Sequence, residues 1–369
     1  MGEAPELTSI TRRKTVRPLV AAWMFVIVLM ATGAIWLSLS DDVETAPEVA
    51  PTHEANAPSG ENISIALADD VGHGTVPISA TENSVPVGEE QPAHKDLSLV
   101  KAPIDGLTHK GANGFLPVLG PDSKVAWKEY ARPVGAAGQA SDERPQLAII
   151  VTGIGLNSRS SNLALAQLPG EIDFGFSPYG RNLQVWMDKA RAKGHEGFLM
   201  IPTEPVSYPE NDPGPHTLLA GAPERDNLKK LDWLLSQVTG YVGVINEMGS
   251  KFTTSEKDVM PILNDLNGRG LMVLDAKSTR FSVVGAAARR ISMPRAINNL
   301  YLDNQLNAAE ISRNLTALEN TARTYGVALG VARAFPLTIR EIEKWARELE
   351  ARGVDLVPVT AIANRQPIR

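Results

Sequence analysis

From about residue 144 to the C-terminus, short apolar runs alternate with amphipathic segments of helical period, and this alternation restricts the possible folds most strongly. Near-continuous apolar runs are typical of strands that are covered on both faces and pair in parallel. The clearest amphipathic segments end in glycine, as helices often do. We therefore predict an α/β fold, a (β/α) barrel of seven or eight strands, with a doubly wound open sheet as the alternative.

The expected strands are apolar runs that stop at polar or turn-forming residues. They are residues 147–155, 172–179, 197–205, 241–249, 271–278, 298–304, 327–335 and 354–360. In both architectures, the functional site lies at the carboxyl ends of the strands. The polar residues at these ends are therefore the candidate site residues.

Four carboxylates at or near strand ends could form an acid/base pair or an oxygen-rich cation site. These catalytic candidates are Glu204, Glu247, Asp275 and Asp303. Other polar residues of the same rim are candidates for substrate binding: Thr152, Asn246, Ser250, Lys277, Arg333 and His216. We expect His195, in contrast, to have a structural role at the end of a helix.

An apolar segment near the N-terminus predicts a membrane anchor. Residues 19–39 are uncharged and mostly apolar, and at a rise of ~1.5 Å per residue they are long enough to span a hydrocarbon core of ~30 Å. Basic residues precede this segment, so residues 1–18 should stay in the cytoplasm and the rest should be exported. We expect a single-pass protein of the inner membrane with its C-terminal domain in the periplasm. A cleaved signal peptide is the alternative.

Three further regions follow the anchor. Residues 40–113 are rich in Pro, Ala and Glu, which predicts a disordered tether. Residues 114–140 concentrate apolar side chains, and we expect either a strap across the folded domain, which we favour, or a docking segment for a partner. Residues 141–369 form the predicted domain.

Charge and cysteine content exclude several kinds of function. The net charge is -6, and no dense Lys/Arg block follows residue 17, which argues against nucleic-acid binding. The chain has no cysteine, so disulfides, thiolate metal ligands and a cysteine nucleophile are excluded.

Five strings carry a resemblance to a known family. They are IPTEPVSYPENDPGPHTLL (201–219), NEMGSKFT (246–253), GLMVLDAKST (270–279), LYLDN (300–304) and VDLVPVT (354–360). With them, residues 146–359 resemble the divergent polysaccharide deacetylase family, a branch of the NodB-like deacetylase superfamily. The resemblance implies a distorted (β/α) barrel. It also implies metal-assisted removal of acetyl groups from a glycan, or descent from enzymes that do so.

The residues that bind the metal in this family are not kept at the matching positions. Members usually have Asp-Asp where this chain has Thr152 and Gly153, and a metal-binding histidine where it has Glu247. The second histidine position is Ala332 or Arg333. Because an Asp-His-His set and cysteine are both absent, a zinc-activated water has too few of its preferred ligands. We expect no metal cofactor.

Glu247 stands where an apolar run stops, and an isolated charge there is costly unless it is paired. The favoured interpretation is an ion pair with Arg333 or Lys277, which would replace the lost metal charge. Two alternatives remain: a ligand in a new carboxylate site, or an acid/base group.

These inferences predict a membrane-anchored, envelope-facing protein of cell-wall carbohydrate metabolism. We expect a pseudoenzyme that binds a cell-wall glycan or an envelope protein. The alternative is an active carbohydrate deacetylase or hydrolase with a carboxylate-based site.

Overall fold

The computed structural model describes residues 97–134 and 144–367. The predicted cytoplasmic N-terminus, the anchor at 19–39 and most of the predicted tether lie outside the described residues. Among the residues that are described, no helix is long and apolar enough to cross a membrane.

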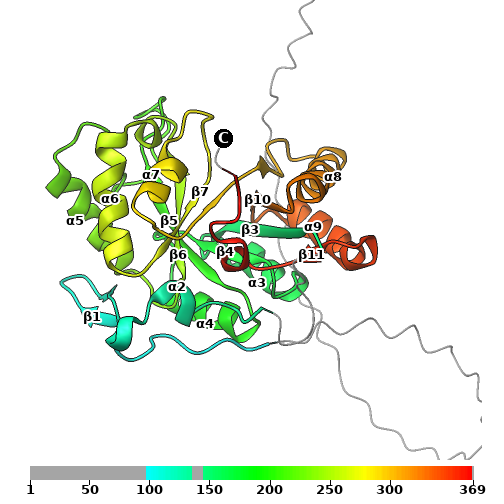
Figure 1. Cartoon of the computed structure of the whole chain (residues 1–369), viewed down its shortest axis with the longest axis horizontal. Helices are drawn as coiled ribbons and strands as arrows, with labels where there is room; N and C mark the ends of the chain where they lie inside the picture. Colours follow the sequence, from blue (N-terminus) through cyan, green and yellow to red (C-terminus); the bar gives the residue numbers. More distant parts are fainter. Residues whose placement is uncertain (1–96, 135–143, 368–369) are drawn as a thin grey trace, which may run out of the picture. The chain divides into compact units, whose positions relative to one another are not determined.

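A curled, parallel sheet forms the centre of the domain (Figure 1). Its strand order is β8-β7-β6-β5-β4-β3-β10-β9. The six strands that make up most of it are β3 (Gln146–Ile154), β4 (Asp173–Phe176), β5 (Gly197–Thr203), β6 (Gly243–Met248), β7 (Met272–Asp275) and β10 (Val327–Arg333). Residues 147–151 of β3 have no exposed surface, as expected for a strand with packing on both faces.

The two ends of the sheet are joined by one short segment. β8 (Arg295–Ile297) pairs with β7, and β9 (Leu300–Tyr301) pairs with β10. Only Asn298 and Asn299 separate β8 from β9. The backbone N–H of Asn298 donates to the Asp275 carbonyl, and that of Asn299 donates to the Leu329 carbonyl. The strands therefore form the predicted distorted (β/α) barrel of the NodB-like type, and the open-sheet alternative is wrong.

The last two predicted strands differ from the structure. The run 298–304 is not one strand, because the segment changes partner from β7 to β10 at Asn298 and Asn299. The run 354–360 contains only β11 (Asp355–Leu356), which pairs with the start of β3, and then the 3-10 helix η4 (Val359–Ile362). In both runs, the strands are shorter than predicted because their length depends on which neighbouring strand they pair with, and the apolar residues alone do not show this.

Helices lie around the curled sheet (Figure 1). They are α3 (Ser158–Gln167), α4 (Leu183–Ala192), α5 (Glu224–Leu235), α6 (Glu256–Gly268), α7 (Val284–Arg290), α8 (Ala308–Tyr325) and α9 (Pro336–Leu349). Local sequence fixes several ends. The Asn307 side chain accepts hydrogen bonds from two N–H groups of the first turn of α8. Gly326, with φ 81°, ends the same helix.

Residues 97–134 pack against the barrel. They contain the hairpin β1 (Thr108–Lys110) and β2 (Phe115–Pro117), the 3-10 helix η1 (Pro121–Ser123) and the short helix α2 (Ala126–Glu129). Arg191 of α4 is 1% exposed and donates to the carbonyls of Val100 and Tyr130 in this segment. The part of the predicted strap or docking segment that is described therefore has apolar and polar contacts with the domain.

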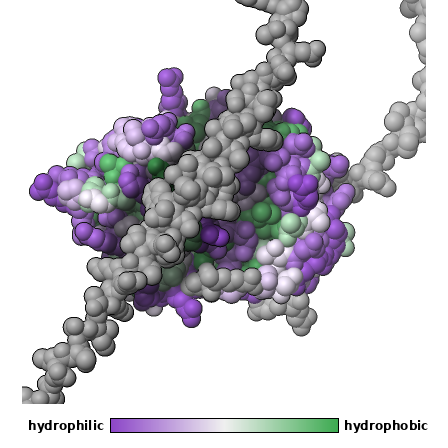
Figure 2. All heavy atoms as spheres, turned by 90° about the horizontal axis from the view of Figure 1, so that it is seen from above, coloured by the Kyte–Doolittle hydropathy of each residue, from purple (hydrophilic) through white to green (hydrophobic). Residues whose placement is uncertain are grey.

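Most of the face in Figure 2 is hydrophilic, and smaller hydrophobic areas interrupt it.

Candidate functional site

The carboxyl ends of the barrel strands carry unusual backbone conformations. Met248 at the end of β6 has φ 55°, and Lys277 just after β7 has φ 51°. A non-glycine residue in this left-handed region costs on the order of 1–3 kcal/mol, and such residues cluster at functional sites. These two residues lie at the end of the barrel that the sequence predicted as the site, which is called the mouth below.

Glu204 follows β5 and is neutralised by Lys251. Its Oε1 lies 2.6 Å from the Lys251 Nζ, and its Oε2 accepts a hydrogen bond of 2.7 Å from the Ala220 N–H. The Glu204 side chain is 7% exposed, whereas that of Lys251 is 51% exposed. Glu204 therefore holds two loops of the mouth together.

Asp303 follows β9 and is neutralised by Arg333 at the end of β10. Arg333 donates its backbone N–H to Asp303 Oδ2 at 2.9 Å, and its Nε lies 3.4 Å from Asp303 Oδ1. The Thr338 hydroxyl donates to the same carboxylate at 3.1 Å. The side chain of Asp303 is 1% exposed, so this carboxylate is a structural link between β9, β10 and α9.

Asp275 at the end of β7 is hydrogen-bonded within its own loop. It accepts from the Ser282 hydroxyl at 2.9 Å and from the Lys277 N–H at 2.8 Å. Burial raises the pKa of Asp275, although these hydrogen bonds act in the opposite direction. The Lys277 ammonium has no ion pair or hydrogen bond with another residue of 97–134 or 144–367.

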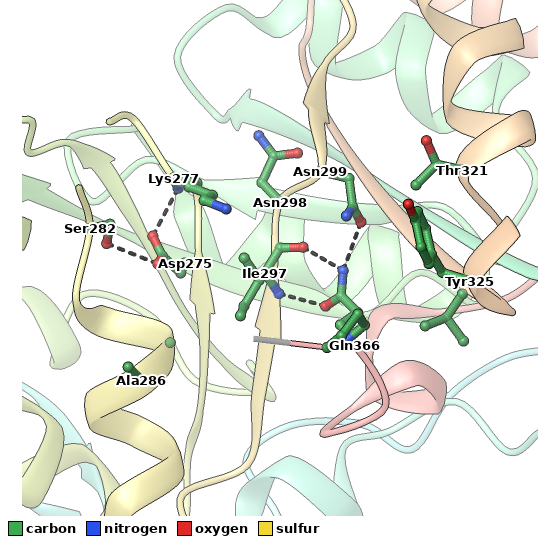
Figure 3. Close-up of a pocket in the computed structure, with 13 residues that line it drawn as sticks. Asp275, Lys277, Ser282, Ala286, Ile297, Asn298, Asn299, Thr321, Tyr325 and Gln366 are labelled. Carbon is green, nitrogen blue, oxygen red and sulfur yellow. Dashed lines mark hydrogen bonds between the residues drawn. The ribbon is translucent and has the colours of Figure 1, made fainter. Parts of the chain in front are cut away.

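Asp275 and Lys277 line a groove of about 460 Å³ beside the segment that joins β8 to β9 (Figure 3). Carboxamides from Asn298, Asn299 and Gln366 also line it. The Gln366 amide bonds both the N–H and the carbonyl of Ile297, and it also donates to Asn299 Oδ1 (Figure 3). These amide groups close the barrel, so they are already committed to structural contacts.

Glu247 on β6 does not form the ion pair that we favoured from the sequence. Its carboxylate has no ion pair or hydrogen bond with another described residue. Arg333 pairs with Asp303 instead, because β10 lies beside β9 in the strand order and far from β6. Burial alone raises the pKa of Glu247 to about 7.

A ring cluster lies near Glu247. The His216 ring stacks on Trp233 with ring centroids 3.6 Å apart, and the His216 backbone N–H donates to the Tyr179 hydroxyl at 3.1 Å. Burial, with a smaller contribution from Lys230, lowers the pKa of His216. Burial raises the pKa of Tyr179, and the charge of Glu247 adds to this. The sequence analysis missed both aromatic residues. Tyr179 ends the predicted strand 172–179 and could have been included on that ground, whereas Trp233 lies within α5, where an aromatic side chain usually belongs to the core.

The remaining predicted binding residues join neighbouring strand ends. Thr152 donates to the Ala332 carbonyl at 2.9 Å. Asn246 accepts from the Ala276 N–H at 2.8 Å and donates to the Met248 carbonyl. Ser250 accepts from the Val206 N–H at 3.0 Å.

The polar contacts of Thr152, Asn246 and Ser250 are thus internal. His195 is also structural, as expected, because its Nδ1 lies 2.7 Å from the Ile172 carbonyl and its ring stacks on Phe174.

These residues do not fit a divalent metal. No group of three or more His, Cys, Asp or Glu side chains is placed to hold one within the described ranges. Glu204 and Asp303 already have lysine and arginine partners. The end of β3 carries Thr152 and Gly153, neither of which has a carboxylate or imidazole side chain. Glu247 is not part of any such group among the described residues, so it supplies too few donors for a metal site, which needs several.

Comparison with known protein families identifies one family. A family model described as divergent polysaccharide deacetylase matches residues 149–363. An uncharacterised protein of Haemophilus influenzae is 24% identical over 205 residues, which is 55% of this chain and 72% of the relative. The uncharacterised protein YibQ of Escherichia coli is 23% identical over 224 residues, which is 60% of this chain and 69% of the relative.

A crystal structure of the uncharacterised protein ATU2773 from Agrobacterium tumefaciens is similar in sequence and in fold. It is 40% identical, with a TM-score of 0.64, and the alignment covers 68% of this chain and 99% of that one.

Proposed function

Because this chain belongs to the divergent polysaccharide deacetylase family, we propose that it is a non-catalytic member that acts in the cell envelope as a binding module. Its mouth would hold a ligand or partner without removing acetyl groups. The chemistry of the family would require a divalent metal, and the residues of this mouth offer no ligand set for one.

The observation that supports this proposal is the neutralisation of mouth carboxylates by cations of the protein. Lys251 lies 2.6 Å from Glu204, and Arg333 contacts Asp303 through its backbone N–H and its guanidinium. A carboxylate that is paired in this way is a poor ligand, because the cation would have to be displaced before a metal could bind.

We also propose that residues 19–39 anchor the protein in the inner membrane and that the domain faces the periplasm. This rests on the length of the apolar segment and on the basic residues before it. The absence of cysteine is compatible with that compartment.

A metal and acetate measurement on the purified full-length protein tests the non-catalytic proposal. We expect less than one divalent ion per chain after dialysis. We also expect no acetate release from acetylated peptidoglycan when zinc, manganese or cobalt is supplied. Stoichiometric metal that is retained by the wild type and lost in Glu247→Ala would refute the proposal. So would acetate release above that of a heat-denatured sample.

One observation favours a second function, an acid/base enzyme. Glu247 is unpaired in the described structure, and a pKa near 7 suits proton transfer at neutral pH. In that case, wild-type protein would hydrolyse a wall glycan without added metal. Glu247→Gln would lower the rate by about 100-fold or more. An unchanged rate in Glu247→Gln would exclude this function.

A further inference from the structure

Two buried carboxylates lie at the floor of the barrel, which is the end opposite the mouth. Asp173 is the first residue of β4, and Glu196 directly precedes β5. Both residues have 0% of their surface exposed. Because both lie at the start of a strand, neither carboxylate belongs to the mouth.

The two carboxyl groups are neighbours, because they bind consecutive residues of the C-terminal part of the chain. Asp173 Oδ2 accepts from the Val359 N–H at 2.6 Å. Glu196 Oε1 accepts from the Thr360 hydroxyl at 2.5 Å, and its Oε2 accepts from the Thr360 N–H at 3.4 Å. Glu196 Oε1 also accepts from the Arg132 N–H at 2.7 Å. The carboxyl pair therefore holds the end of the N-terminal segment and the start of η4 against the floor.

No cation pairs directly with either carboxylate among the residues that the structure describes. The Arg132 guanidinium lies 2.5 Å from Glu171 and donates to the Gly194 carbonyl. Arg191 donates to three backbone carbonyls. Burial lowers the pKa of His195 to about 4, so its ring is neutral at physiological pH. The charged and titratable groups around the pair are Arg132, Glu171, Arg191, Lys193 and His195.

Two negative charges side by side at this position would be very unfavourable. Asp173 Oδ1 is buried and has no hydrogen-bond partner among the described residues, and burial disfavours the charged form of a carboxyl group. Burial, with the charge of Glu196 adding to it, raises the pKa of Asp173 well above its ordinary value. Burial also raises the pKa of Glu196 to about 7. The folded protein therefore keeps a proton between the two groups at mildly acidic pH.

We propose that Asp173 and Glu196 form a pH-sensitive latch, which holds residues 97–134 and η4 on the barrel floor while the two groups share a proton and loosens them when that proton is lost. In the loosened form, where water reaches the pair, both groups would have released their protons above about pH 5. The closed form still holds one there. Loosening therefore becomes more favourable as pH rises, and it levels off once the closed form has also lost its proton.

Hydrogen exchange of the full-length protein, followed by mass spectrometry from pH 5 to pH 8, tests the latch. Exchange rates are corrected for the intrinsic pH dependence of amide exchange, so that the remaining change reports opening. We expect protection of residues 126–134 and 355–362 to fall by about tenfold or more over this range, and protection of β6 to change by less than about threefold. An equal fall in β6 would mean that the whole domain opens. Either that result or constant protection at the floor would overturn the proposal.

Two isosteric variants locate the effect. Glu196→Gln and Asp173→Asn each leave one carboxylate, so no proton has to be shared. We expect the pH-dependent loss of floor protection to shrink to less than about threefold in each. Glu319→Gln is the control and should keep the wild-type fall, because Glu319 is a buried carboxylate that pairs with Arg323 and Arg352. A wild-type fall in either pair variant, or a flattened one in Glu319→Gln, would overturn the proposal.

Discussion

Replacing Glu247 by glutamine should stabilise the protein at alkaline pH. Burial raises the pKa of Glu247 from its ordinary 4.5 to about 7 in the folded protein. Between these two values, the unfolded chain has released the proton and the folded protein still holds it. The free energy of unfolding must therefore fall as pH rises through this window, and the loss is complete above the folded pKa.

The size of this loss follows from the pKa difference. One pKa unit corresponds to about 1.4 kcal/mol, so a difference of two to three units gives an upper bound of about 3–4 kcal/mol. The Glu247 side chain keeps partial solvent contact, which reduces the cost of its charge. We therefore expect Glu247→Gln to be more stable than the wild type by about 1–3 kcal/mol at pH 8, and about equal to it at pH 4.5.

Urea unfolding, followed by tryptophan fluorescence from pH 4.5 to 8, measures the difference between the two curves. Other buried carboxylates contribute to both curves alike; one of them is Glu196, whose pKa burial raises to about 7. Glu210→Gln is the control, because Glu210 is an exposed carboxylate on the same face. Parallel curves for wild type and Glu247→Gln would refute the reasoning, because they would mean that Glu247 is either well solvated or paired.

Three further changes test the structure of the mouth and of the segment that joins β8 to β9. Gly249→Ala should lower the free energy of unfolding by about 1–3 kcal/mol, because Gly249 has φ 91° and an added Cβ would lie 2.2 Å from the Thr203 hydroxyl. Gly268→Ala is the control: Gly268 has open space around it, so this change should not destabilise the protein in the same urea assay. Lys251→Met should lower the free energy of unfolding by about 1–3 kcal/mol, because it leaves Glu204 buried without a cation. Adding Glu204→Gln to this variant should recover most of the lost stability. If the double variant instead lost the sum of what the two single variants lose, the pairing would be contradicted. Gln366→Ala should lower the free energy of unfolding by about 1–3 kcal/mol and speed amide hydrogen exchange in β8, because the Gln366 amide bonds the N–H and the carbonyl of Ile297. Unchanged exchange in β8 would show that this side chain does not close the barrel.

The fold class could be predicted from the sequence because it depends on local patterns. Strands that are buried on both faces must be apolar throughout, and helices that cover them must be amphipathic, so the alternation itself predicts an α/β fold, either a (β/α) barrel or a doubly wound open sheet. Strand ends near 154, 203, 248 and 333 were predicted to within a few residues. The resemblance to the family also implied that the usual metal ligands are replaced at 152, 153 and 247.

The contacts between strand ends could not be predicted in this way, because they depend on the order of the strands around the barrel. That order places Asp303 beside Arg333, and it leaves Glu247 without the cation that we expected. It also makes Asn298 and Asn299 the joint at which the barrel closes. By itself, then, the sequence determined the fold class, and through the family resemblance it predicted that the usual metal ligands are replaced. Only the tertiary structure decided which charges are paired, because those contacts join residues that are distant along the chain.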